Sequence, residues 1–186
     1  MITYARHQGP TSLTAAAPLV DLYAVVYAEP PYNEGLEQVD RFRTSLLEES
    51  RRPGFTLITA KDGDTLIGAS YGWIMPAGTW WSNASRPAPA EIVDAAKFAV
   101  MEWIVTPRRR GEGIGDVLIR QLLEDRPERF ATLASDPRSA ARGMYRRAGW
   151  IEAGETTLSW GPSMDLLLLK LPLPTSQKVG NDQARP

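Results

Sequence analysis

The sequence contains no cysteine and a single histidine, His7, and both scarcities narrow the chemistry open to the protein. Without cysteine there is no disulfide, no thiolate nucleophile and no cysteine-ligated metal, which favours a cytoplasmic location. One histidine near the N-terminus cannot form a histidine-rich metal site, and a Ser-His-Asp triad is not expected. We therefore expect chemistry that needs neither a metal ion nor a protein thiol.

Long apolar runs are also missing, because no stretch reaches the roughly 20 residues that a membrane-spanning helix needs. The first residues do not lead into a basic segment and an apolar core, so no signal peptide is predicted. The formal net charge is -1, which argues against a dedicated nucleic-acid-binding protein. We expect no membrane and no nucleic-acid partner, and a monomer or homodimer.

The length of 186 residues suggests one domain that is large enough to bury a core. We expect this domain to span residues 1–173 and the polar remainder, 174–186, to form a disordered tail. Charge is unevenly distributed: arginines outnumber acidic residues between 106 and 150, whereas acidic residues outnumber arginines between 29 and 49. The first region suits an anion and the second a cation.

Hydrophobic spacing predicts an α/β domain with a central sheet. The stretch KFAVMEWIV is apolar enough for a central strand, and KDGD between two β-rich runs predicts a hairpin turn. In chain order we expect a strand (2–7), two helices (12–32 and 33–54), a hairpin (55–75), a loop (76–90), a strand (97–105), a helix (114–125), a strand (129–135), a helix (138–148) and three strands (149–154, 156–160 and 164–172).

Several residues are predicted to cap these helices. Asn33 is a suitable N-cap for the second helix. Asp136 followed by Pro137 is typical of an N-cap and a first helical residue, which places the start of a later helix there. Gly149 is expected at the C-terminal cap of that helix.

Three arginines and three alternating glycines meet in the stretch VTPRRRGEGIGDVL, where the central strand leads into a predicted helix. A helix N-terminus presents unpaired backbone N–H groups and the positive end of the helix dipole. Gly111, Gly113 and Gly115 lack a Cβ, so a ligand can approach the main chain, and Arg110 adds charged donors. The combination predicts a phosphate or pyrophosphate site; the alternative is a plain turn at the start of a helix.

The glycine spacing excludes two common phosphate-binding motifs. Counted from Gly111, the last position of G-x-G-x-x-G is Asp116, and the P-loop pattern G-x4-G-K-[ST] is absent. Arg110-Gly111-Glu112-Gly113-Ile114-Gly115 does fit [QR]-x-x-G-x-[GA], and Val105-x-Pro107 precedes it. This stretch resembles the acetyl-coenzyme-A loop of the GNAT (GCN5-related) N-acetyltransferase superfamily.

A second motif of that superfamily, N-x-x-A-x-x-[LM]-Y-x-x-x-G-[FW], is matched in register by Ala141, Met144, Tyr145, Gly149 and Trp150. Arg138 stands where the family usually has the Asn that contacts the cofactor arm. The resemblance covers residues 2–172. It implies the GNAT fold, an α/β fold with a mixed central sheet of about seven strands flanked by about four helices and splayed at the cofactor site.

The resemblance implies acetyl-CoA as the acetyl-donor cosubstrate and no metal. The pantetheine arm would pair with the backbone of Ile104 and Val105, and the pyrophosphate would bind the amides of residues 111–115. The other arginines near these motifs are also consistent with a solvated surface. The implied cofactor-binding residues are Ile104, Val105, Arg110, Gly111, Glu112, Gly113, Ile114, Gly115, Asp116, Arg138, Ala141 and Tyr145.

Two residues are candidates for proton transfer. Tyr145 matches the family's general acid for the leaving thiolate, and core packing is its alternative role. Glu102, a lone carboxylate in an apolar strand, is a possible general base; alternatively it faces solvent or pairs with a basic residue. Ala99 and Leu133 stand where some relatives place a catalytic glutamate, so a water chain remains another proton path.

The acceptor is less defined. The resemblance implies that the two N-terminal helices, with the stretch YAEPPYNE between them, line the acceptor side. The implied activity is acetyl-CoA-dependent transfer to a primary amine of a small molecule or peptide, by direct attack in a ternary complex. A non-catalytic acyl-CoA-binding module is the alternative. A set of tryptophans could form an aromatic wall, although core and loop packing is the more ordinary role for Trp73, Trp80, Trp81, Trp103 and Trp160.

Overall fold

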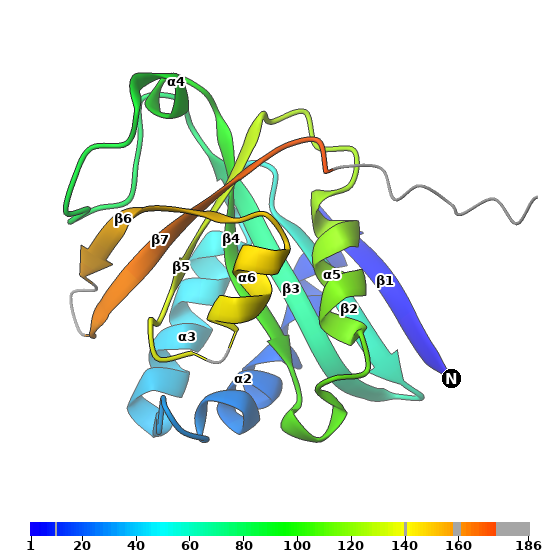
Figure 1. Cartoon of the computed structure of the whole chain (residues 1–186). Helices are drawn as coiled ribbons and strands as arrows, with labels where there is room; N and C mark the ends of the chain where they lie inside the picture. Colours follow the sequence, from blue (N-terminus) through cyan, green and yellow to red (C-terminus); the bar gives the residue numbers. More distant parts are fainter. Residues whose placement is uncertain (10, 140, 158–160, 174–186) are drawn as a thin grey trace, which may run out of the picture.

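The computed structural model describes residues 1–9, 11–139, 141–157 and 161–173, and its centre is a mixed sheet in the order β1-β2-β3-β4-β5-β7-β6 (Figure 1). Neighbouring strands are antiparallel except β4 and β5, which are parallel. The predicted mixed α/β architecture is therefore confirmed. The strands are β1 (Ile2–Gln8), β2 (Thr56–Asp62), β3 (Thr65–Met75), β4 (Lys97–Val105), β5 (Phe130–Ser135), β6 (Ile151–Thr157) and β7 (Ser163–Lys170).

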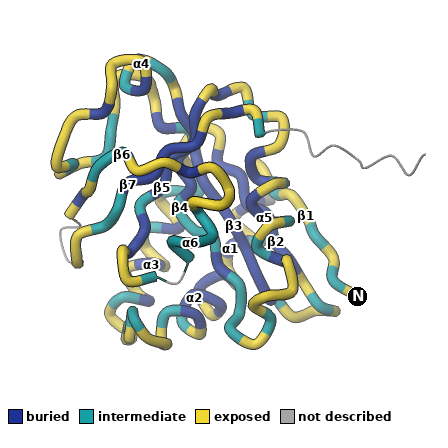
Figure 2. The backbone as a smooth tube through the Cα atoms, in the orientation of Figure 1, coloured by how far each residue is buried: buried dark blue, intermediate teal, exposed yellow. Residues whose placement is uncertain are grey.

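Helices cover both faces of this sheet, so the central strands are buried on both sides (Figure 2). Helices α2 and α3 pack on one face, and α5 packs on the opposite face across β2, β3 and β4. The helical segments are α1 (Thr11–Ala16), α2 (Leu19–Tyr27), α3 (Leu36–Glu49), α4 (Ala90–Val93), a 3-10 turn (Pro107–Arg109), α5 (Ile114–Leu123) and α6 (Arg142–Arg147).

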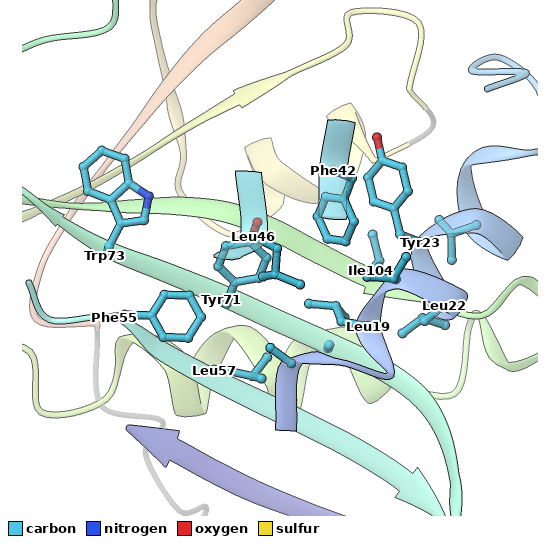
Figure 3. Close-up of a cluster of buried hydrophobic side chains, with 14 of the residues drawn as sticks. Leu19, Leu22, Tyr23, Phe42, Leu46, Phe55, Leu57, Tyr71, Trp73 and Ile104 are labelled. Atoms are coloured by element: carbon cyan, nitrogen blue, oxygen red, sulfur yellow. The ribbon is translucent and has the colours of Figure 1, made fainter. Parts of the chain in front are cut away.

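The core under α2 and α3 is partly aromatic (Figure 3). The rings of Tyr23 and Phe42 stack with centroids 3.9 Å apart, which joins the two helices. Leu19 of α2 is fully buried in the same cluster. Tyr71 of β3 and Ile104 of β4 also belong to this cluster. This packing fixes α2 against the end of β4, which is where the functional site lies.

Two predictions for the N-terminal helices are wrong. The single helix expected over 12–32 is divided into α1 and α2, because Pro18, which lacks an N–H group, stands just before α2. Asn33 is not the N-cap of α3 and has a φ of 50°; Gly35 is the N-cap. The Gly35 N–H donates to Oε1 of Gln38 at 3.1 Å. A side chain of the first helical turn thus caps the N-terminus of α3.

The predicted start of the later helix is also wrong. α6 begins at Arg142 rather than after Asp136, because the Asp136 carboxylate accepts the backbone N–H of Arg138 at 2.8 Å and pairs with its guanidinium. The N-cap of α6 is Ala141, which makes no side-chain capping bond; its own N–H donates to Ser139 Oγ at 3.2 Å in the turn before the helix. Gly149 follows the helix with a φ of 88°, in agreement with the predicted C-terminal cap.

Three strands were expected after α6, and the described part of the chain has two there. Residues 156 and 157 continue β6, which pairs with β7 through a β-bulge between Glu152 and Gly154. The rest of the predicted strand over 156–160 lies outside the described residues, as does the tail 174–186 that was expected to be disordered.

The segment between β3 and β4 is held by a buried ammonium group. Lys97, at the start of β4, is fully buried and its Nζ donates to backbone carbonyl oxygens of the segment. The distances are 3.4 Å to Pro76, 3.1 Å to Ile92, 3.4 Å to Val93 and 3.0 Å to Ala95. The Pro76 and Val93 carbonyl oxygens also accept backbone N–H groups, so Lys97 adds bonds that join the two ends of this segment.

The same segment also covers the edge of the sheet at β6. The Ser85 N–H donates to the Glu155 carbonyl oxygen at 2.7 Å, and Ala84 forms an isolated bridge with Thr156. The Trp81 indole donates to Thr132 Oγ1 at 2.9 Å, which ties the segment to β5. An edge strand that is paired in this way is less available to another chain.

Candidate functional site

The sheet opens between β4 and β5. These strands pair only at Phe98–Ala131 and Ala99–Thr132, and β4 then continues to Val105 without β5 as its neighbour. A β-bulge against β3, between Tyr71 and Gly72, leaves one extra residue in β4 at this point. Bulges bend and twist the strand that carries them. The end of β4 therefore leaves part of its main chain free for a ligand.

A cavity of about 560 Å³ occupies this opening. Its walls are the diverging ends of β4 and β5, the glycine-rich start of α5, the start of α6, and the segment that follows α2. Predicted site residues that line it are Glu102, Ile104, Val105, Arg110, Gly111, Gly113, Ile114, Gly115, Asp116, Ala141 and Tyr145. The structure thus brings together most of the residues that the two sequence motifs indicated.

The three glycines have different roles. Gly111 and Gly113 have φ values of 84° and 77°, and a Cβ on either would meet nothing within 4 Å. Gly113 is the N-cap of α5, so open space lies next to the unpaired amides of the helix start. Gly115 is instead closely packed, because a Cβ there would lie 3.3 Å from Trp103 Nε1, which donates to the Gly115 carbonyl oxygen. The free space at the first two glycines is what an approaching anion needs.

Arg109 and Arg110, next to the glycines, differ in their ion pairs. Arg109 pairs with Asp62 and Glu112, each at 2.8 Å, and these carboxylates raise its pKa. Arg110 reaches across the cavity mouth to Glu29, with Nη1 and Oε2 3.1 Å apart, and its Nε donates to the Val105 carbonyl oxygen at 3.3 Å. Arg110 therefore lies at the glycine-rich end of the cavity, whereas the charge of Arg109 is compensated beside it.

Tyr145 projects from α6 toward β4. Its ring lies 5.5 Å from Trp103 and 6.4 Å from Trp150, measured between centroids, and its hydroxyl is hydrogen-bonded with the Ser135 side chain. Burial raises the pKa of Tyr145 to about 12, and the Ser135 bond opposes part of that rise. The hydroxyl is thus protonated at neutral pH and lies in the wall of the cavity.

Glu102 lies on the opposite side of the cavity, on the face of β4 that α2 covers. It is half-buried, and its Oε2 accepts a hydrogen bond of 2.9 Å from the Tyr27 hydroxyl. Burial raises its pKa to about 8; the Tyr27 bond lowers it, and Glu49 and Glu34 raise it further. Within the described part of the chain, no basic side chain forms an ion pair with Glu102. A carboxyl with this pKa exchanges protons near neutral pH.

Other predicted residues lie elsewhere. Arg138 does not line the cavity, because its guanidinium is held by Asp136, with 2.6 Å between Nη2 and Oδ2. Glu112 is turned toward Arg109. Trp73, Trp80 and Trp81 pack against the core under α2 and α3, so they form no wall of the cavity, while Trp103 does line it. Trp160 lies outside the described residues.

Sequence reasoning did not single out the residues that close the cavity on the α2 side. This side is lined by Tyr27, Pro30, Pro31 and Tyr32. The Tyr32 hydroxyl is hydrogen-bonded with the side chain of Ser139, which lines the opposite side of the cavity. The resemblance implied that the stretch YAEPPYNE lies on the acceptor side, but it did not indicate which of its residues line the cavity. Which of its side chains face the cavity depends on how α2 packs on β4.

No group of three His, Cys, Asp or Glu side chains is placed to hold a metal ion within the described ranges. In the same ranges, no helix combines the length and the apolar character needed to cross a membrane.

An open mixed sheet that splays beside a glycine-rich helix start, with a tyrosine and a glutamate on opposite walls, defines the class of CoA-dependent acyltransferase folds. The sequence profile of the Acetyltransferase (GNAT) family matches residues 19–150 of this chain. This match covers more than half of the chain, and the protein therefore belongs to the GNAT acetyltransferase family.

Individual relatives are distant. The GCN5-like protein acetyltransferase Rv2170 of Mycobacterium tuberculosis is 29% identical over 101 residues, which cover 47% of this chain and 48% of the relative. The chain thus spans about half the length of the curated relative that it matches.

Solved structures share the fold over nearly the whole chain. A PaiA N-acetyltransferase from Thermoplasma acidophilum in complex with coenzyme A is 11% identical, with a TM-score of 0.60 over 92% of this chain and 99% of that one. NAA60 of Arabidopsis thaliana in complex with a bisubstrate analogue is 14% identical, with a TM-score of 0.62 over 94% of this chain and 100% of that one.

Proposed function

We propose that this protein is an acetyl-CoA-dependent N-acetyltransferase that acetylates a primary amine of a small molecule or peptide. The observation that carries this proposal is the convergence of three features on one cavity. A strand end without a partner, an exposed helix start and two titratable side chains, Glu102 and Tyr145, all line it. A fold without catalysis would need only the first two.

The cavity suits the donor in shape and charge. Open space beside Gly111 and Gly113 can receive a pyrophosphate at the amides of α5, and Arg110 stands at the same end. The free edge of β4 at Ile104 and Val105 can pair with the amides of the pantetheine arm as an added strand would. Both contacts use main chain that has no strand or helix partner on this side; the Val105 carbonyl oxygen accepts only from the Arg110 side chain among the described residues.

Glu102 and Tyr145 would handle the two protons of the transfer. Acetyl-CoA supplies an activated thioester, and the amine forms the new C–N bond as the C–S bond breaks. Glu102, with a pKa of about 8, would accept the proton that the amine loses. Tyr145, with a pKa of about 12, would donate a hydrogen bond, and then its proton, to the departing sulfur. Holding both reactants in one cavity supplies much of the remaining rate enhancement.

The acceptor would enter on the α2 side of the cavity. This side offers the carboxylate of Glu102 and an apolar, aromatic surface from Tyr27, Pro30, Pro31 and Tyr32, which suits an amine with an apolar body. The name of one relative, a protein acetyltransferase, supports a peptide or protein amine. We retain both a small-molecule amine and a peptide amine as acceptors.

The first experiment is calorimetric titration of the purified protein with acetyl-CoA, beside ADP and NAD as controls. Selective binding of acetyl-CoA is expected. Amines and short peptides are then screened by release of free thiol, and mass spectrometry of the product determines whether the acetyl group is on nitrogen. Selective binding without turnover of any acceptor would favour a non-catalytic acyl-CoA-binding module, and absence of binding would contradict the donor assignment.

A further inference from the structure

Three tyrosine hydroxyls donate to three glutamates on the face of the sheet that α2 and α3 cover. The bonds are Tyr27 to Glu102 at 2.9 Å, Tyr71 to Glu49 at 2.7 Å, and Tyr23 to Glu34 at 2.6 Å. The pairs differ in position: Tyr27 and Glu102 both line the cavity, whereas the members of the other two pairs do not. The Tyr27–Glu102 bond is thus the one that can act on the reaction.

We propose that Tyr27 is a positioning residue for Glu102, because its hydroxyl holds the carboxylate at the wall of the cavity and stabilises the ionised form. This inference rests on the proposed function, in which Glu102 accepts the proton of the amine. Tyr27 touches Glu102 rather than the reacting atoms in this arrangement, so it acts through the carboxylate.

The ring of Tyr27 is held firmly enough for this role. Its centroid lies 4.3 Å from that of Tyr23 and 4.7 Å from that of Tyr32, in tilted and edge-on arrangements. Tyr23 is in turn stacked on Phe42 of α3. A ring held between two others has few alternative rotamers, so its hydroxyl stays directed at Glu102.

The carboxylate needs this donor because its other surroundings oppose ionisation. Burial and the nearby Glu49 and Glu34 carboxylates favour the neutral form, and the Tyr27 hydrogen bond favours the charged form. Within the described residues no second side chain donates to Glu102. Removal of the hydroxyl would leave a partly buried carboxylate without a donor, and its pKa would rise.

Several titratable groups face Glu102 and have to be considered in any pH experiment. They come from α2, α3, β3, α6 and the segments after α2, and each interacts with Glu102 electrostatically. These groups are Tyr23, Tyr27, Tyr32, Glu34, Glu49, Tyr71 and Tyr145.

Tyr27→Phe removes the hydroxyl and keeps the ring. We expect the pKa of Glu102, measured by NMR of carboxyl-labelled glutamate in the protein without ligands, to rise by roughly one unit. The ratio of wild-type to variant kcat/KM for one amine would then be roughly tenfold at pH 7 and below about twofold at pH 9.5. The ratio falls because Glu102 is mostly ionised in both proteins at the higher pH. A role in packing alone would leave this ratio independent of pH.

Tyr71→Phe is the matched control, since it removes a tyrosine-to-glutamate bond of the same kind on the same face, from a residue outside the cavity. We expect no rise in the pKa of Glu102 in this variant. In a Glu102→Gln background, Tyr27→Phe should no longer change the pH profile, because the group on which it acts is gone.

The outcomes separate this inference from the proposed function. If Glu102→Gln changes the pH profile but Tyr27→Phe shifts neither the profile nor the Glu102 carboxyl resonance, the role of Tyr27 is wrong and the base assignment stands. If Glu102→Gln leaves the profile unchanged while Tyr27→Phe still raises the Glu102 pKa, the positioning contact is real and the base assignment falls.

Discussion

Tyr145 and Glu102 show how single residues obtain their chemistry from their surroundings. Tyr145 lies between two tryptophans of the α5 side, where burial keeps its hydroxyl protonated. Glu102 lies on the other face of β4, where burial raises its pKa toward neutrality. A protonated hydroxyl and a carboxyl with a raised pKa therefore line the same cavity.

Replacement of Tyr145 tests the donor. Tyr145→Phe removes the hydroxyl and keeps the ring packed on Trp103, so the turnover number should fall by roughly 10²-fold or more while acetyl-CoA affinity changes little. Steady-state kinetics and calorimetry measure the two quantities. Tyr4→Phe, which alters another tyrosine that packs against the same core, is the control. An unchanged turnover number in Tyr145→Phe would remove this residue as the acid.

The pKa of Glu102 also predicts how stability depends on pH. Its folded-state pKa, about 8, lies above its ordinary value of 4.5, so the folded state binds the proton more tightly than the unfolded state. The stabilisation from the neutral carboxyl is therefore present at low pH and is lost as the pH rises from about 5 to about 8.

We expect the free energy of unfolding to decrease over this interval more in the wild type than in Glu102→Gln, by up to roughly 3 kcal/mol. Urea unfolding at pH 5, 7 and 9 measures the difference. Glu49, whose pKa burial also raises, is present in both proteins, so the difference between them reports Glu102 together with its coupling to Glu49. Parallel pH dependences in the two proteins would show that Glu102 does not have a raised pKa.

At the level of elements, the start of α5 is the feature that the sequence described best. The alternation of glycines predicted close approach of a ligand to the main chain, and the structure shows open space at Gly111 and Gly113. Gly115, however, makes room for Trp103. The same residue type thus meets two different requirements within five positions, and only the packing of β4 against α5 distinguishes them.

Gly113→Ala tests this element. The variant should weaken acetyl-CoA binding tenfold or more, because the new Cβ enters the space that the pyrophosphate needs. Its positive φ of 77° also adds backbone strain, so Gly78→Ala is the matched control: Gly78 has the same φ, has open space around it and lies outside the cavity. Both variants should lose similar stability in thermal unfolding. Equal acetyl-CoA affinity of the two variants in calorimetry would argue against the phosphate cradle.

The starts of the other helices were predicted less well. Asp136 and Asn33 are both residue types that favour N-cap positions, yet neither caps a helix. The Asp136 carboxylate is bound by Arg138, and the chain reaches α3 only after Asn33 has taken a positive φ. Cap preference is a local tendency, and local competitors that cost little in free energy can displace it.

At the scale of the whole molecule, the segment after α2 contacts both the α5 side and the α6 side of the cavity. Glu29 pairs with Arg110 on the α5 side, and Tyr32 is hydrogen-bonded with Ser139 on the α6 side. The acidic part of the chain, expected to suit a cation, thus meets the arginine-rich part at the cavity mouth. No acidic residue between 29 and 49 lines the cavity itself.

This arrangement predicts competition between Glu29 and a bound pyrophosphate for Arg110. Glu29→Gln should tighten acetyl-CoA binding by about two- to fivefold, a small effect because the ion pair is half-exposed. Calorimetry at low salt and at 0.5 M salt should show the gain shrinking as the charges are screened. Glu37→Gln, which removes an exposed acidic charge paired within α3, is the control. Weaker binding in Glu29→Gln would mean that Glu29 orients Arg110 for the ligand.

The amino-acid sequence by itself determined the order and type of most elements, the glycine-rich start of α5 and the family motif, because these depend on spacing along a few neighbouring residues. The tertiary structure decided where β4 and β5 separate, which acidic residues pair with the arginines and what surrounds Glu102. Tyr27 and Glu102 are 75 positions apart, and their hydrogen bond exists only because α2 packs across the end of β4. Burial and hydrogen bonding between distant segments set the pKa of a side chain, so no local pattern of residues could reveal it.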